Sequence, residues 1–305
     1  TEHYEMVLKA GDMERALPKL AWQMEEPRVG QSYPNYYSAQ LAGKFVKVVL
    51  SGTGGDELFG GYPWRYYRAV GNDNFEQYID KYYLYWQRLL DNDTIKRVFP
   101  KVWNDAGQLS TRGIFKNVFR HHKDDLETPE DYINHSLYFE AKTFLHGLLV
   151  MEDKLSMAHG LETRVTFLDN DLVDFAMRCP VSLKLNNLAE VVHINENDSG
   201  NKRGKFFQKT RDGKQILRNV MKQYIPESVT EAVKQGFSAP DASWFKGDSI
   251  DFVKRTLING NALIYEYMER SEVEKLIQEH LNGDQNRRLL IWSLLNVEQY
   301  LKQPI

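Results

Sequence analysis

A short apolar run followed by a glycine-rich, acidic segment is the feature that most constrains this chain. The run Val48–Leu50 is typical of a strand in the middle of a parallel sheet that is covered on both faces. Gly52, Gly54 and Gly55 allow a sharp turn and let a ligand approach the backbone closely. The acidic pair 56–57 stands where a helix should begin. A strand, loop and helix of this kind predict a nucleotide-binding edge of an α/β sheet.

A purely structural role explains the same pattern equally well. Glycine-rich turns between a strand and a helix occur as plain connections, and acidic residues at a helix start stabilise the helix dipole without any ligand. The motif therefore becomes a functional hypothesis only when the rest of the chain supplies a matching context.

Composition and charge exclude several classes of protein. Of 305 residues, 42% are hydrophobic and 12% aromatic, so a sizeable core can form and global disorder is excluded. The net charge of −3, with mixed signs, gives no support to nucleic-acid or membrane-surface binding. The only cysteine is Cys179, which excludes an internal disulfide and a thiol zinc cluster. We expect a cytoplasmic protein without nucleic-acid or membrane partners.

Helical periodicity dominates the remainder of the chain. We expect helices at about 12–25, 36–43, 74–92, 136–151, 215–223, 250–258, 271–281 and 287–301, a further helix start at 128–131, and strands at 46–50 and 189–194. Few basic residues accompany the aromatic residues of 74–92, which predicts core packing rather than base stacking. The polar segment 195–214 is expected to be exposed and mobile. We predict a helix-rich α/β fold that forms a single domain over residues 1–305.

A second cluster of charged residues lies in the otherwise apolar segment 151–169. Its members are Glu152, Asp153, Lys154, His159, Glu162, Arg164 and Asp169. The alternative to a functional site is a solvated face with ion pairs, such as Glu162 with Arg164. His159 has no second histidine at metal-ligand spacing, so a zinc site is not proposed.

A third cluster lies around Lys234. This lysine precedes turn-forming small residues and is flanked by the apolar Phe237 and Trp244. Such a lysine is usually just exposed unless an anionic group lies nearby.

The three clusters together resemble the asparagine synthetase family over nearly the whole chain. The segment 51–62 resembles its Ser-Gly-Glu-Gly-x-Asp-Glu loop, and 153–169 is similar to Asp-Arg/Lys-x-Ser-Met-Ala-x-Gly-Leu-Glu-x-Arg-Val-Pro-Phe-Leu-Asp. Residues 213–218 and 234–237 resemble its Gly-Lys-x-x-Leu-Arg and Lys-Gln-Gly-Phe strings, and 292–298 resembles its closing tryptophan helix.

That resemblance implies an ATP-dependent synthetase of the adenine nucleotide α-hydrolase (PP-loop ATPase) type. Its reaction adenylates the β-carboxylate of aspartate, releases pyrophosphate, and transfers the aspartyl group to ammonia to give asparagine and AMP. The implied residues facing ATP or AMP are Leu50, Ser51 and Gly52, with Asp56 as the Mg²⁺ ligand. The implied catalytic residues are Lys154, Lys234 and Thr53, and the implied supporting residues are Glu57, Asp153, Glu162 and Arg164.

The sequence also departs from the family pattern. Thr53 stands where the family has a glutamate assigned to the attack of ammonia, and threonine is a poor general base. The family's Ser-Gly-Gly-x-Asp-Ser loop is expected upstream of Thr1, and Cys179 cannot serve as the nucleophile of the glutamine-hydrolysing half. We therefore expect a fragment that is inactive alone and receives ammonia directly or from glutamine through a separate glutaminase domain.

Three readings stay open at this point. The first is asparagine synthesis, the second is a related amidoligase that acts on another carboxylate, and the third is a non-catalytic scaffold or binding relative. Whether the chain forms a homodimer is left open by the sequence.

Overall fold

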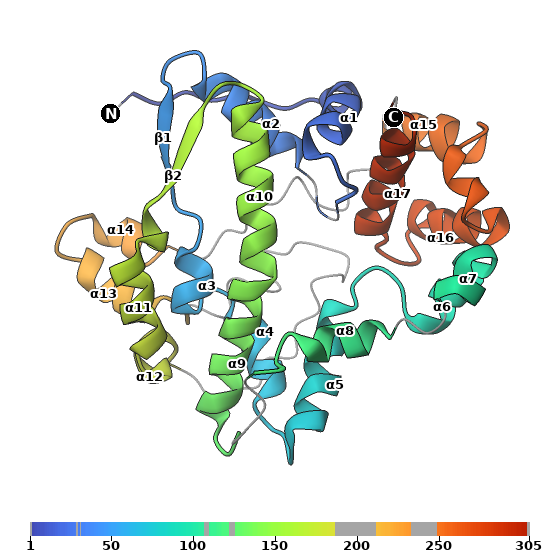
Figure 1. Cartoon of the computed structure of the whole chain (residues 1–305). Helices are drawn as coiled ribbons and strands as arrows, with labels where there is room; N and C mark the ends of the chain where they lie inside the picture. The colour runs from blue at the N-terminus through green and yellow to red at the C-terminus, as the bar shows by residue number, and fades with distance from the viewer. Residues whose placement is uncertain are drawn as a thin grey trace.

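The computed structural model describes residues 2–28, 30, 32–106, 110–121, 126–186, 212–232 and 249–303, and it is helix-rich α/β (Figure 1). Its strands are β1 (Val48–Ser51) and β2 (Glu162–Val165). The first helices are α1 (Ala10–Met24), α2 (Tyr33–Ala42), α3 (Gly55–Phe59), α4 (Pro63–Tyr66), α5 (Phe75–Trp86), α6 (Asn92–Val98), α7 (Pro100–Ala106), α8 (Thr111–Asn117) and α9 (Pro129–Lys142). The later helices are α10 (Phe144–Met157), α11 (Asn170–Arg178), α12 (Val181–Lys184), α13 (Gln215–Met221), α14 (Glu227–Thr230), α15 (Ser249–Val253), α16 (Arg270–Asn282) and α17 (Arg288–Leu301). Short 3₁₀ segments cover Tyr67–Ala69, Thr166–Leu168 and Leu263–Glu266, and a π-helical turn covers Lys254–Ile258.

Within the described residues the sheet consists of β1 and β2, which pair in parallel with Val48 opposite Glu162 and Leu50 opposite Arg164. Side chains alternate between the two faces of a strand. Val48 and Leu50 are 51% and 75% exposed, whereas Val49 is half-buried. The predicted burial of this strand on both faces is therefore wrong, because helices cover only one face of the described sheet.

Helices α9 and α10 follow one another along the middle of the molecule, and β2 follows α10 (Figure 1). The predicted start of α9 is confirmed: Thr128 and Asp131 form a reciprocal capping box ahead of the first turn. The predicted helix at 136–151 is wrong in its bounds, because α9 ends at Lys142 and α10 begins at Phe144. The apolar pattern continues across this break, so periodicity did not reveal it.

Most other predicted helices are confirmed with small shifts at their ends. α1, α2, α13, α16 and α17 match their predictions, and 250–258 is divided between α15 and the π-helical turn. The helix expected at 74–92 ends at Trp86, because Asp91 starts α6 by accepting a hydrogen bond from the N–H of Thr94 at 2.8 Å.

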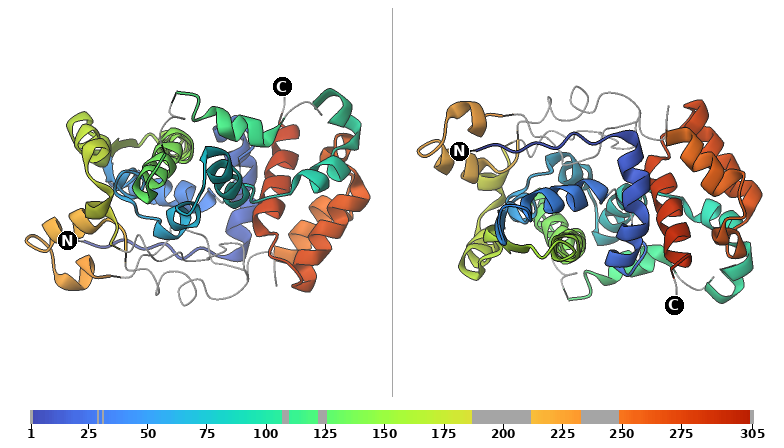
Figure 2. Two further views of the ribbon diagram at one scale, coloured as in Figure 1. Left: turned by 90° about the horizontal axis from the view of Figure 1, so that it is seen from below. Right: turned by 90° about the horizontal axis from the view of Figure 1, so that it is seen from above.

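Two large apolar clusters hold the helices together. One joins α1 with α15, α16 and α17 around the fully buried Trp292, and the views of Figure 2 show α1 and α17 side by side. The other is built from aromatic rings of α5, α8 and α9, including Tyr78, Tyr82, Phe115 and Phe139. This second cluster confirms that the aromatic residues of 74–92 form core.

The polar segment predicted to be exposed is described only at its end. The expected strand at 189–194 and residues 195–211 lie outside the described residues. Asp212 is 8% exposed and its carboxylate accepts a hydrogen bond from Tyr67, so the prediction of exposure is wrong there. Among the described helices, none has the length and apolarity needed to cross a membrane.

Candidate functional site

The loop that follows β1 turns at Gly54, whose neighbours leave no room for a side chain. Gly54 has φ +98°, in the left-handed region, and a Cβ there would lie 2.5 Å from the side chain of Leu168. A Cβ at Gly52, in contrast, would meet no atom of the described residues within 4 Å. The main chain at Gly52 therefore borders open space at the carboxyl end of β1, as the predicted ligand approach requires.

The first side chains of this loop form a directed chain of hydrogen bonds. The hydroxyl of Ser51 donates to Thr53 Oγ1 at 3.0 Å and accepts from the Thr53 N–H at 3.2 Å. Thr53 Oγ1 in turn donates to Glu152 Oε2 at 2.6 Å. Glu152 belongs to α10, so this chain links the loop after β1 to the central helix.

Asp56, in the first turn of α3, faces a lysine from a distant segment. Lys214 Nζ lies 2.8 Å from Asp56 Oδ1, and the two side chains are 29% and 23% exposed. The N–H of Lys214 donates to the Phe59 carbonyl at 3.0 Å, and a Cβ at Gly213 would lie 2.6 Å from the Gly60 carbonyl oxygen. The backbone at 213–214 is thus docked closely onto the end of α3, which fixes the lysine beside the carboxylate.

Glu57 points the other way, into the protein. It is 2% exposed, and its Oε1 accepts a hydrogen bond from the Tyr62 hydroxyl at 3.1 Å. Burial raises the pKa of the Glu57 carboxyl, and the nearby Asp56 charge raises it further. Glu57 therefore lies inside the protein and is bound to Tyr62, while the supporting role expected for it in the site stays a prediction.

Replacing Glu57 with glutamine should change how stability depends on pH. A raised pKa in the folded state means that the native protein holds this proton more tightly than the unfolded chain does, so the native state loses stability as pH rises above about 4.5. Glutamine still accepts from Tyr62 but never ionises. We expect Glu57→Gln to gain stability relative to the natural chain between pH 4.5 and 7, by about 1.4 kcal/mol per unit of pKa shift. Urea unfolding at several pH values measures the free energy of unfolding of both proteins. If this free energy changed with pH in the same way for both, the expectation would be wrong.

Of the other predicted residues, Lys154 makes its hydrogen bonds to the end of α1 and the residue after it. Lys154 lies two positions after Glu152 on α10, so the two side chains leave the helix on different sides. Its ammonium donates to the Met24 carbonyl at 2.8 Å and to Glu25 Oε2 at 2.7 Å. Asp153 is exposed. Lys234 lies outside the described residues, so its role stays a prediction.

The charged residues of β2 form the ion pair expected of a solvated face. Arg164 Nε lies 3.1 Å from Glu162 Oε1, with both side chains more than half exposed. Through the strand pairing they share their face with Val48 and Leu50. Leu50 therefore lies on the face opposite to the Ser51 side chain, and the contact with ATP or AMP expected for it stays a prediction.

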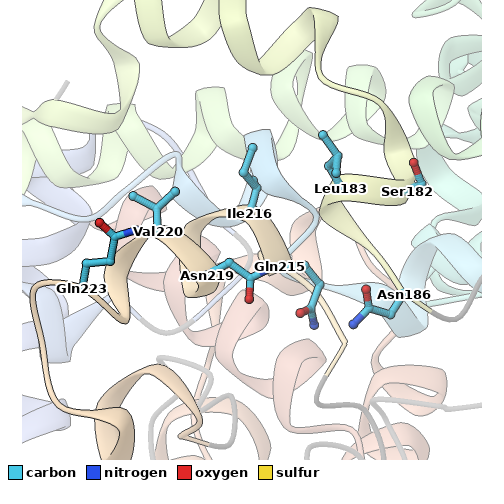
Figure 3. A pocket seen from close by; sticks show the side chains of 8 residues that line it. All are labelled: Ser182, Leu183, Asn186, Gln215, Ile216, Asn219, Val220 and Gln223. Carbon is cyan, nitrogen blue, oxygen red and sulfur yellow. The ribbon is translucent and has the colours of Figure 1, made fainter.

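A pocket of about 400 Å³ lies between α12 and α13, and its lining begins at Gln215, the residue after Lys214 (Figure 3). Its described lining consists of Ser182, Leu183, Asn186, Gln215, Ile216, Asn219, Val220 and Gln223. Amides and aliphatic groups offer neither a charge for phosphate nor a base for proton transfer. The candidate site is accordingly placed at the loop and not in this pocket.

The carboxylate of Asp56 is a group of the loop that could help to hold a metal ion. The described residues contain no group of three or more histidine, cysteine or acidic side chains that could hold a metal ion by themselves. Magnesium is usually bound through one or two carboxylates together with substrate phosphates and water. The partly exposed carboxylate of Asp56 suits that mode.

Two residues of this arrangement were not among the predicted site residues. The sequence places Glu152 only within a charged segment, and Lys214 only within a motif resemblance. Their partners, Thr53 and Asp56, are remote in sequence, so periodicity and spacing could not pair them. The resemblance of 213–218 to Gly-Lys-x-x-Leu-Arg was the available signal for Lys214.

Comparison with known proteins gives a consistent result. The family profile described as asparagine synthase matches residues 1–302. The chain is 26% identical over 340 residues to asparagine synthetase [glutamine-hydrolyzing] 1 of Bacillus subtilis, covering 98% of this chain and 48% of that protein. It is 25% identical over 322 residues to a putative asparagine synthetase of Mycobacterium bovis, covering 96% and 45%. A putative asparagine synthetase of Methanocaldococcus jannaschii is 46% identical over 63 residues, 20% of this chain and 12% of that protein. The chain spans about half the length of the first two relatives.

Proposed function

Because the chain belongs to the asparagine synthase family, we propose that it carries the synthetase site of an ATP-dependent, amide-forming ligase. A carboxylate attacks the α-phosphate of ATP, which gives an acyl-adenylate and pyrophosphate. A nitrogen nucleophile then attacks the acyl carbon and releases AMP. Such a site belongs to the adenine nucleotide α-hydrolase type of α/β fold, with aspartate as the first candidate substrate and ammonia as the nucleophile.

One observation supports this proposal above the others. The open main chain at Gly52, the carboxylate of Asp56 and the ammonium of Lys214 all lie around the loop between β1 and α3. Ligands of parallel α/β sheets bind at this carboxyl edge. The loop thus combines close backbone approach with one anionic and one cationic group, which adenylation requires.

The residues of the loop have separable tasks in this scheme. Asp56 would hold Mg²⁺, which when bound neutralises oxygens of the leaving pyrophosphate. Lys214 supplies a compact positive charge at the same place. Gly52 leaves room for the nucleotide, and the buried Glu57 keeps the first turn of α3 in position through Tyr62.

A related ligase with another carboxylate substrate is the second candidate. Thr53 occupies the position where the resemblance gives a glutamate, so the second half-reaction has a different side chain at this point. This difference favours a nitrogen acceptor or an acyl group other than those of asparagine synthesis.

Exchange of labelled pyrophosphate into ATP tests the proposal directly. It needs only the adenylation half-reaction, so it is independent of the nitrogen source. We expect the protein that carries this chain to catalyse exchange only with Mg²⁺ and a suitable carboxylate. Aspartate and a panel of other carboxylic acids, tested singly, would identify the substrate. Absence of exchange with every acid, together with absence of ATP binding by calorimetry, would leave only the non-catalytic reading.

A further inference from the structure

The hydrogen bond between Thr53 and Glu152 has the length of a bond to an ionised carboxylate. Hydroxyl donors approach ionised carboxylates to about 2.5–2.7 Å, and the distance here is 2.6 Å. Because the Ser51 hydroxyl donates to Thr53, the Thr53 proton is directed toward Glu152. The loop therefore presents a carboxylate beside the predicted adenylate site, although Thr53 itself has none.

Glu152 is not committed to a structural ion pair. In the described part of the chain, the Thr53 hydroxyl is its side-chain partner, and no lysine or arginine lies within ion-pair distance of it. It is half-buried on α10, where Leu155 and Ser156 of the following turn are buried. A rigid helix thus holds a carboxylate that has acceptor capacity left for a substrate proton.

Amide formation requires a group that accepts a proton from the attacking nitrogen. When a nitrogen nucleophile attacks the acyl carbon of an acyl-adenylate, its lone pair forms the C–N bond and the C–O bond to AMP breaks. The electron pair of that bond leaves with AMP, and the nitrogen must lose one proton. Threonine is a poor acceptor for this proton, whereas a carboxylate within reach can serve as general base.

We propose that Glu152 is the general base of the amide-forming step and that Thr53 is the positioning residue that orients it. The proposal rests on the proposed function, since it needs an acyl-adenylate. Glu152 takes the proton from the nitrogen nucleophile, and Thr53 holds Oε2 so that the other oxygen faces the acyl carbon. The nucleophile is ammonia or a primary amine that arrives on the α10 side of the loop.

The test separates the two half-reactions in the protein that carries this chain. We expect Glu152→Gln to keep pyrophosphate exchange within about twofold of the natural protein, while amide formation from ammonia falls about 10²-fold. Hydroxylamine is largely unprotonated at neutral pH, so hydroxamate formation should fall less than tenfold. Glu127→Gln is the matched control, because Glu127 is exposed and precedes α9; both half-reactions should be unchanged in it.

Variants of Thr53 test the positioning role. Thr53→Val removes the hydroxyl and should lower amide formation by about tenfold, whereas Thr53→Ser should restore it. The proposal is overturned if Glu152→Gln forms amide normally, or if it loses exchange and amide formation to the same extent. Absence of exchange in the natural protein itself would overturn the proposed function, and this inference with it.

Discussion

Replacing Arg65 with methionine while Glu140 stays in place is expected to destabilise the folded chain by about 3–5 kcal/mol. Arg65 Nη1 lies 3.3 Å from Glu140 Oε2, and the two side chains are 6% and 0% exposed. Loss of the arginine leaves a buried carboxylate whose desolvation is no longer offset by an opposite charge. Urea unfolding followed by circular dichroism should show a lower midpoint at an unchanged slope.

The surroundings of the pair explain why the cost should be high. The hydroxyls of Tyr82 and Tyr66 donate to Glu140 at 3.0 and 3.4 Å, and the Arg65 guanidinium lies 3.8 Å from the centre of the Tyr62 ring. The pair therefore ties α4, which follows the loop and α3, to α9 and α5. A double variant, Arg65→Met with Glu140→Gln, removes the buried charge, keeps an acceptor oxygen for one tyrosine and offers an N–H to the hydroxyl oxygen of the other, and it should recover most of the lost stability.

An exposed pair on the same helical region provides the control. Arg112 lies 2.9 Å from Glu76 Oε2 and 2.5 Å from Asp80 Oδ1, and the three side chains are 34%, 53% and 57% exposed. Solvent screens such a pair, so Arg112→Met should cost at most about 1 kcal/mol. If Arg65→Met were no more harmful than Arg112→Met, the buried pair would contribute little and the expectation would be wrong.

Local features of the sequence predicted the loop correctly. The strand, the turn and the helix start are all encoded within 48–57, because glycine conformation and acidic residues at a helix start act over a few positions. The same holds for α9, whose start depends only on Thr128, Pro129 and Asp131. Features that depend only on residues a few positions apart can be predicted without knowledge of the tertiary packing.

Features that depend on distant packing could not be predicted. Thr53 and Glu152 are 99 positions apart, and their contact exists because α10 leads into β2, which pairs with β1. An apolar run such as Val48–Leu50 shows that a strand forms, but not how many neighbours cover it. The exposure of Leu50 therefore follows from how the helices and strands pack, and it could not be predicted from the local sequence.

Replacing Asp56 with asparagine is expected to lower pyrophosphate exchange by about 10³-fold and to change the free energy of unfolding by no more than about 1 kcal/mol. Asparagine has the same shape but no charge, so it is a much weaker partner for magnesium. The side chains of Asp56 and Lys214 are 23% and 29% exposed, and asparagine keeps a side-chain oxygen that can accept from the Lys214 ammonium, so the substitution costs little stability.

A loss of exchange without a comparable loss of stability would identify Asp56 as part of the site and not of the scaffold. Glu231→Gln is a suitable control, because it removes the partner of Lys222, at 2.7 Å, from another partly exposed pair in the segment that follows Lys214. This control should leave exchange unchanged. Binding of Mn²⁺ in the presence of ATP, followed by electron paramagnetic resonance, gives a readout besides activity, and it should weaken only in Asp56→Asn. Normal Mn²⁺ binding with normal exchange would remove Asp56 from the site, whereas equal losses of stability and exchange would make it a structural residue of α3.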